Sequence, residues 1–170
     1  MSAPFPVRRR RWAWVGMLAA VVTVLAGALS PPLLSPTWRA AMMHVFSPVC
    51  HQIPVRSPVL GGVQIAICDR CTGIYLGLVI GVATVGWGRG IWRALGQHDR
   101  YLLLGSLVPA CIDWLGPILG LWGNGPVSRA LTGMLFGGVA ASFVADRLLT
   151  RLRRRPEADT STGTDDRGFA

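Results

Sequence analysis

Four residues that commonly bind metals or exchange electrons fall in one short stretch of the chain. Cys50 and His51 are adjacent, and Cys68 and Cys71 form a Cys-x-x-Cys motif. Three thiolates and one imidazole are a ligand set that tetrahedral zinc accepts, and thiolates also bind iron. The Cys-x-x-Cys spacing lets both sulfurs turn toward one ion, whereas adjacent residues ligate together only where the backbone turns sharply. We therefore predict a metal site on these four residues, with zinc or iron as the ion.

The same cysteines allow two other interpretations. In a membrane thiol–disulfide oxidoreductase, Cys68 and Cys71 would be the redox pair, because a helix capped by Asp69 would place both near its N-terminus, where N–H groups stabilise a thiolate. In a small structural membrane subunit, a fixed disulfide such as Cys50 to Cys68 would stabilise the loop by ~3 kcal/mol. Thr72 stands where a covalent c-type haem motif has His, so no covalent haem is predicted.

Charged residues also occur where apolar surroundings are expected. Asp113 lies inside a long apolar run, where an ionised carboxylate is costly and needs a partner. Arg129 is the first candidate partner and Arg70 the second. Together with Arg56, these residues are predicted to line a polar pocket under the cysteines; the alternative is an ion pair that only fixes helix packing. Cys111 is predicted to be a small buried residue and not a ligand.

Long apolar runs, separated by short polar joints, place these residues in a membrane. At ~1.5 Å rise per residue, 18 residues just cross a ~30 Å hydrocarbon core. The fold class predicted is all-α, a polytopic integral membrane helix bundle in contact with the lipid bilayer. Its membrane domain is 12–150, with about four transmembrane helices at about 12–29, 71–87, 101–122 and 127–149.

The segments outside these runs differ in character. Residues 1–11 are an Arg-rich leader, and the first run could also be a cleaved signal peptide, although its length and bulky side chains favour a retained helix. The connector 30–70 is Pro-rich and carries the Cys/His residues. The tail 151–170 has no apolar period and is predicted to be disordered.

Small residues recur at every fourth position in two of the runs. Such stripes let helix backbones approach closely in a membrane, where the hydrophobic effect does not drive association. We predict that the second and fourth helices pack closely, on each other or through self-association of two chains. The two stripes are Gly73, Gly77 and Gly81, and Gly133, Gly137, Ala141 and Ala145.

The distribution of arginine predicts the orientation. All 17 basic residues are Arg, the net charge is +9, and charged residues make up only 15% of the chain. Because the arginines flank apolar runs, they fit membrane topology better than a nucleic-acid surface. With four helices, 13 Arg lie on the side of both termini and 4 on the other. The positive-inside rule then predicts cytoplasmic termini and a Cys/His connector outside the plasma membrane, where disulfides persist.

Several of these segments together resemble a known family. The segments 46–57 (with Cys-His-Gln), 62–64 and 68–77 (Cys-x-Arg-Cys-Thr-Gly-Ile-Tyr-x-Gly) resemble the signature of domain of unknown function 2085, a family of small prokaryotic membrane proteins. The resemblance continues through Asp113 and Arg129 and covers roughly residues 40–140. It implies a membrane location and the same candidate positions, and it implies no activity.

The function predicted is therefore a binding or transport role rather than an enzymatic one. An extracytoplasmic Cys/His site, with bound metal, would lie above a polar intramembrane pocket. No Ser/His/Asp triad, phosphate-binding glycine loop or paired catalytic carboxylates are apparent in the sequence, and no nucleic-acid partner is expected. The residues do not specify the small-molecule ligand.

Overall fold

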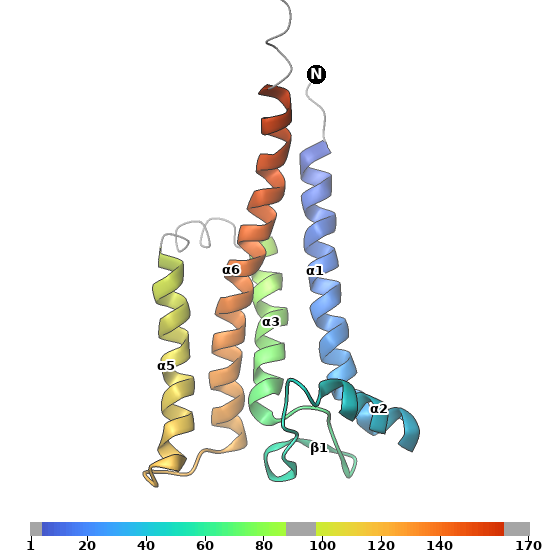
Figure 1. Cartoon of the computed structure of the whole chain (residues 1–170), viewed down its shortest axis with the longest axis vertical. Helices are drawn as coiled ribbons and strands as arrows, with labels where there is room; N and C mark the ends of the chain where they lie inside the picture. The colour runs from blue at the N-terminus through green and yellow to red at the C-terminus, as the bar shows by residue number, and fades with distance from the viewer. Residues whose placement is uncertain (1–4, 88–97, 162–170) are drawn as a thin grey trace, which may run out of the picture.

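A computed structural model describes residues 5–87 and 98–161 of the chain (Figure 1). Most of these residues are helical, which confirms the prediction of a mainly helical fold. The helices are α1 (Phe5–Leu29), α2 (Pro36–Phe46), α3 (Asp69–Trp87), α5 (Asp99–Ile118) and α6 (Pro126–Ser161).

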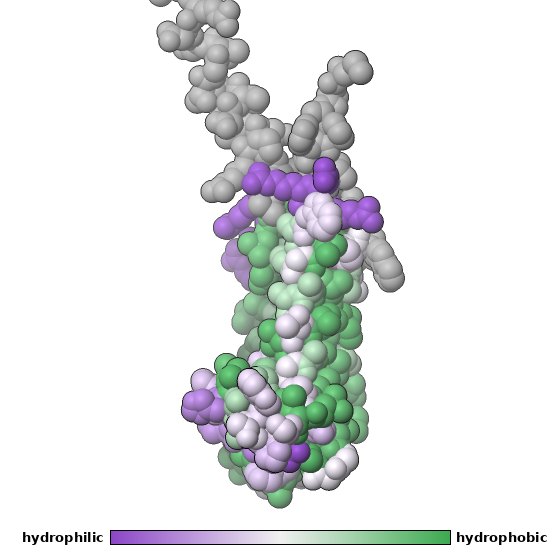
Figure 2. All heavy atoms as spheres, turned by 90° about the vertical axis from the view of Figure 1, so that its right-hand side faces the viewer, coloured by the Kyte–Doolittle hydropathy of each residue, from purple (hydrophilic) through white to green (hydrophobic). Residues whose placement is uncertain are grey.

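The long helices stand side by side in a row, in the order α5, α6, α3, α1 (Figure 1). Helix α6 contacts both α3 and α5, and α1 packs against α3 and α6. The start of α1 and the end of α6 lie at one end of the bundle, and the segment between α1 and α3 lies at the other (Figure 1). On the face seen in Figure 2, hydrophilic side chains gather at the first of these ends, above a mainly hydrophobic surface.

Three of the described helices are long and apolar enough to cross a membrane. They correspond to Arg8–Leu29, Arg100–Ile118 and Pro126–Arg151. Helix α3, the predicted second span, is not among them, because its first turn contains Asp69 and Arg70. Three candidate spans are therefore established by length and composition, and the fourth remains a prediction.

Two predicted helix ends differ from those in the structure. Helix α5 ends at Ile118, before Trp122, and the chain then turns through Gly120, whose φ of 68° is readily adopted only by glycine. Helix α6 continues to Ser161, so the predicted disorder is wrong for 151–161; Arg, Glu and Ala are strong helix formers even without an apolar period. The rest of that tail, and the predicted cytoplasmic Arg89 and Arg93, lie outside the described residues.

The two stripes of small residues pack against each other between α3 and α6, as predicted. A Cβ at Gly73 would collide with the backbone of Ala130, and one at Gly77 would collide with Met134 and Gly138. Gly137 in turn leaves room for the carbonyl of Ile74. The stripes are covered within one chain, so self-association through them would require α3 and α6 to separate.

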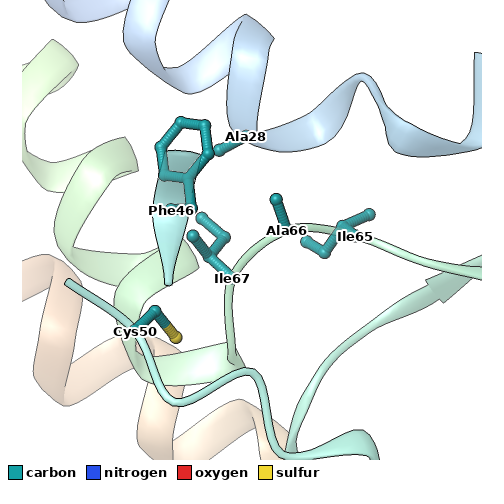
Figure 3. Close-up of a cluster of buried hydrophobic side chains, with 6 residues drawn as sticks. All are labelled: Ala28, Phe46, Cys50, Ile65, Ala66 and Ile67. Atoms are coloured by element: carbon teal, nitrogen blue, oxygen red, sulfur yellow. The ribbon is translucent and has the colours of Figure 1, made fainter. Parts of the chain in front are cut away.

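The connector between α1 and α3 folds into a compact cap. It contains α2, the 3-10 turns Pro31–Leu33 and Pro54–Arg56, and an antiparallel hairpin of β1 (Val59–Leu60) and β2 (Val63–Gln64). Its small core joins side chains from the end of α1, the end of α2 and the segment after β2 (Figure 3): Ala28, Phe46, Cys50, Ile65, Ala66 and Ile67. This core holds one of the predicted site cysteines in place.

Candidate metal centre

Three of the four cysteines meet where the cap joins α3. The Sγ atoms of Cys50, Cys68 and Cys71 all lie within 4.8 Å of one another, and all four cysteines of the chain are free thiols. Two sulfurs bound to one tetrahedral zinc, each at ~2.3 Å from the metal, would be ~3.8 Å apart. The observed cluster therefore needs only a small contraction to hold a metal ion of this kind.

Backbone turns around Gln52 position the first of these cysteines. Gln52 has a positive φ of 50°, and its Nε2 donates to the carbonyls of Met43 at 2.6 Å and Ala66 at 2.9 Å. Gln64 donates to the carbonyl of Gln52 at 2.8 Å. These bonds fasten the segment after Cys50 to both α2 and the strand before α3. Sequence reasoning gave Gln52 no role, because a clamp between distant carbonyls leaves no local pattern.

A backbone hydrogen bond links two of the sulfur ligands. The N–H of Cys68 donates to Sγ of Cys50 at 3.2 Å. An N–H aimed at a sulfur stabilises negative charge on it, and such outer contacts orient the ligands of a metal site. Cys50 is 4% exposed, so this N–H is a contact to its sulfur that water does not supply.

The structure does not bring His51 into the sulfur group. Cys50 turns into the core of the cap, and the exposed His51 points away from that core because side chains of adjacent residues diverge. The predicted set of three thiolates and one imidazole is thus replaced by a group of three sulfurs. His51 still lines the cavity beside them.

The surroundings of Cys68 lower the pKa of its thiol. Its pKa is lowered to about 5, chiefly because the Cys71 thiol donates a hydrogen bond to it, with smaller contributions from the backbone N–H of Cys71, from Cys50 and from the backbone N–H of Arg70. Burial opposes the shift. A helix N-terminus that stabilises a thiolate was the feature the sequence suggested, and the neighbouring thiol adds to it.

Alkylation of Cys68 in metal-free protein should be nearly independent of pH between pH 6 and 8. Its thiolate is already formed above about pH 5 and is lost as the pH falls through that value. A thiol of ordinary pKa, by contrast, reacts about tenfold faster per pH unit in this range. Trypsin places each cysteine on its own peptide, so iodoacetamide labelling followed by mass spectrometry reports them separately. A tenfold rise per pH unit in the labelling rate of the peptide 57–70 would contradict the lowered pKa of Cys68.

Two ion pairs surround the cysteines, and they differ from the predicted one. Asp113 is paired with Arg70 at 2.7 Å, and Arg129 is paired with Asp69 at 2.8 Å. The first candidate partner of Asp113, Arg129, is therefore wrong, and the second is correct. Asp69 reaches α6 and Arg70 reaches α5. These two residues lie between Cys68 and Cys71, so they connect the sulfur group to both helices.

Asp113 also accepts hydrogen bonds from residues at the start of α6 and just before it. Ser128 donates through Oγ at 2.7 Å, and Asn124 donates through Nδ2 at 3.3 Å. The carboxylate is 6% exposed, so these donors compensate for the loss of water. Neither residue was predicted, because both lie in or beside a loop whose path the sequence does not fix.

Replacing Asp113 by Asn should destabilise the protein by about 1.5–3 kcal/mol. The amide keeps the size of the carboxylate but leaves the Arg70 guanidinium without its counter-charge, and hydrogen bonds to charged groups contribute about this much. The free energy of unfolding in mixed detergent micelles would measure the effect. In a double-mutant cycle with Arg70→Gln, strictly additive losses would show that the two groups do not interact.

A cavity of about 370 Å³ opens beside the three sulfurs. Three of the four predicted lining residues, Arg56, Arg70 and Arg129, line it, whereas Asp113 is not among its lining residues. Its far wall comes from α5. Cys111, predicted to be buried, is exposed on that helix and lies outside the sulfur group, because α5 stands at the edge of the row and packs mainly against α6.

Comparisons with known proteins agree with the membrane location but supply no activity. A family model described as a predicted membrane protein, domain of unknown function 2085, matches residues 50–143. An uncharacterised protein of Methanocaldococcus jannaschii is 29% identical over 100 residues, which cover 59% of this chain and 64% of that protein. The aligned part is thus less than two thirds of the relative's length. No solved structure matches the chain.

Proposed function

We propose that this chain, which belongs to the predicted membrane protein family called domain of unknown function 2085, binds a metal ion through Cys50, Cys68 and Cys71 at the mouth of the cavity beside them. The observation that carries the proposal is that the sulfur of Cys50, which follows α2, lies within 4.8 Å of the two sulfurs at the start of α3. The role is binding or transport, with a metal that is structural or takes part in recognising a ligand.

Zinc or iron(II) suits these ligands. Three thiolates satisfy three positions of a tetrahedral ion, and a fourth would face the cavity, as in metal sites that bind a further ligand. When bound, such an ion would supply a Lewis acid next to the cavity. The chain's own residues orient the sulfurs through Gln52 and the Cys68 N–H, and hold the surrounding helices through the Asp69 and Arg70 ion pairs.

The topology proposed has four spans in the plasma membrane: the three candidate spans and, in addition, α3, which is the second along the chain. Helix α3 lies between α1 and α6 in the row, alongside two of the candidate spans. Both termini would be cytoplasmic, since Arg8, Arg9, Arg11 and Arg151 are exposed at their end of the row. The cap and the three sulfurs would then face the outside.

Metal analysis and thiol counting on the same detergent-purified sample test the proposed metal site. We expect about one zinc or iron per chain, and three further thiols reactive after chelation. Cys111 lies outside the group on the candidate span α5, so its reactivity should be the same before and after chelation, and it serves as the internal reference. A metal-free protein with four reactive thiols would contradict the proposal.

A thiol–disulfide oxidoreductase is the second candidate, favoured by the low pKa of Cys68. The Cys68 thiolate would attack a partner's disulfide and form a mixed disulfide with release of one partner thiol. Cys71 would then resolve it, leaving a Cys68–Cys71 disulfide and the partner fully reduced. A metal-free protein whose Cys68–Cys71 disulfide forms and is reduced reversibly would favour this function over metal binding.

A further inference from the structure

The cavity beside the sulfurs has two chemically different walls. One wall carries Arg56, Arg70 and His51, and the other carries Trp114, Pro117 and Ile118 of α5. Trp114 is 54% exposed and Ile118 is 61% exposed, and both lie on a candidate membrane span. The apolar wall therefore continues onto the surface of α5 that faces hydrocarbon in the proposed topology.

The two arginines paired with carboxylates differ in how many of their guanidinium N–H donors form hydrogen bonds. Arg129 donates from Nε and Nη2 to Asp69 and from Nη1 to Asn124, so all three of its nitrogens are engaged. Arg70 donates from Nη2 to Asp113, while its Nε is buried without a hydrogen-bond partner in the described part of the chain. A guanidinium carries five N–H donors, and Nη1 of Arg70, which lines the cavity, donates to no residue in the described part of the chain.

Arg56 supplies a second cation on the same wall. Its side chain is exposed and has neither an ion pair nor a side-chain hydrogen bond with any residue that the structure describes. The carboxylates of Asp69 and Asp113 are each already paired with another arginine. The positive charge of Arg56 is therefore available to a ligand.

From these contacts we infer that the cavity binds an oxyanion, a phosphate or a carboxylate, attached to an apolar chain. Arg70 and Arg56 hold the oxyanion, and the apolar chain lies along Trp114, Pro117 and Ile118. Guanidinium groups bind both oxyanions through paired, charge-assisted hydrogen bonds. The inference deepens the proposed binding role by naming the ligand class, and it does not require that a metal be bound.

Dodecyl phosphate is the probe that tests this inference. We expect isothermal titration of the full chain in dodecyl maltoside to show saturable binding, and dodecyltrimethylammonium, with the same tail and the opposite charge, to show none. Arg56→Gln should weaken binding about tenfold, the value of one charge-assisted contact. Arg11→Gln removes the same charge at the other end of the bundle and should leave the affinity unchanged.

Arg70→Lys keeps the charge near Asp113 but loses the planar fork, so binding should weaken severalfold in a folded protein. If inorganic phosphate binds with the same dependence on Arg56 and Arg70, the oxyanion site is supported and the ligand is water-soluble. If dodecyl phosphate binds and inorganic phosphate does not, the ligand is a lipid. Equal affinity for both dodecyl compounds, or an affinity unchanged in both arginine variants, would overturn the inference. Metal content measured in parallel shows separately whether the sulfur site fails.

Discussion

Replacing Cys68 by Ser is expected to lower the affinity of the chain for zinc more than ~100-fold. Loss of an outer-shell hydrogen bond alone costs 10–100-fold in metal affinity, and loss of one of three thiolate ligands should cost more. Serine matches the size of cysteine but does not supply a thiolate. Titration of purified protein against a zinc chelator of known affinity measures the change, and the same loss is expected for Cys50→Ser and Cys71→Ser.

Cys111→Ser is the matched control for these variants. It makes the same chemical change on α5, outside the sulfur group, and should leave zinc affinity unchanged. His51→Ala distinguishes two forms of the site: an unchanged affinity is expected if three sulfurs and a cavity ligand complete the shell. Zinc binding that survives all three sulfur replacements would show that the ion lies elsewhere.

The sequence predicts the position of a residue along the helix axis better than the direction in which its side chain points around that axis. Asp113 was expected to need a cationic partner, and it has one. Arg129 and Arg70 are both near the same end of their helices, so depth alone could not choose between them. The choice follows from the rotation of α3, which turns Arg70 toward α5 and Asp69 toward α6.

Local spacing predicted features that depend on one helix at a time. Glycine every fourth residue predicts a flat stripe on whichever helix contains it, and α3 and α6 use their stripes on each other. The Cys-x-x-Cys pair also needs only one helical turn to bring its sulfurs together.

Contacts formed by the cap could not be predicted in the same way. Whether Cys50 or His51 faces the sulfur pair depends on turns fixed by Gln52, whose hydrogen bonds reach α2 and the segment between β2 and α3. The same holds for Asn124, which lies in the loop between α5 and α6 and contacts Asp113. Both are bonds between segments distant in the sequence, so no repeat or spacing signals them.

Replacing Gly77 by Leu is expected to lower the free energy of unfolding by at least ~3 kcal/mol, the upper end for overpacking in a tight interface. Its Cβ would meet the backbone of Met134 and Gly138, which cannot rotate away as a side chain could. Separation of α3 from α6 would also strain the Asp69–Arg129 ion pair. Unfolding by SDS in mixed micelles, followed by far-ultraviolet circular dichroism, measures the loss.

Gly105→Leu is the control, because a Cβ at Gly105 of α5 would meet no atom within 4 Å in the described residues, apart from its own stretch of helix. Leucine there should be neutral or slightly stabilising, since glycine costs about 0.5–1 kcal/mol in a helix interior. Because α3 begins beside Cys68 and contains Cys71, Gly77→Leu should also weaken zinc binding, whereas Gly105→Leu should not. Equal stability of the two variants would mean that the stripes do not hold α3 against α6, and the position of Cys71 relative to the cap would then need another cause.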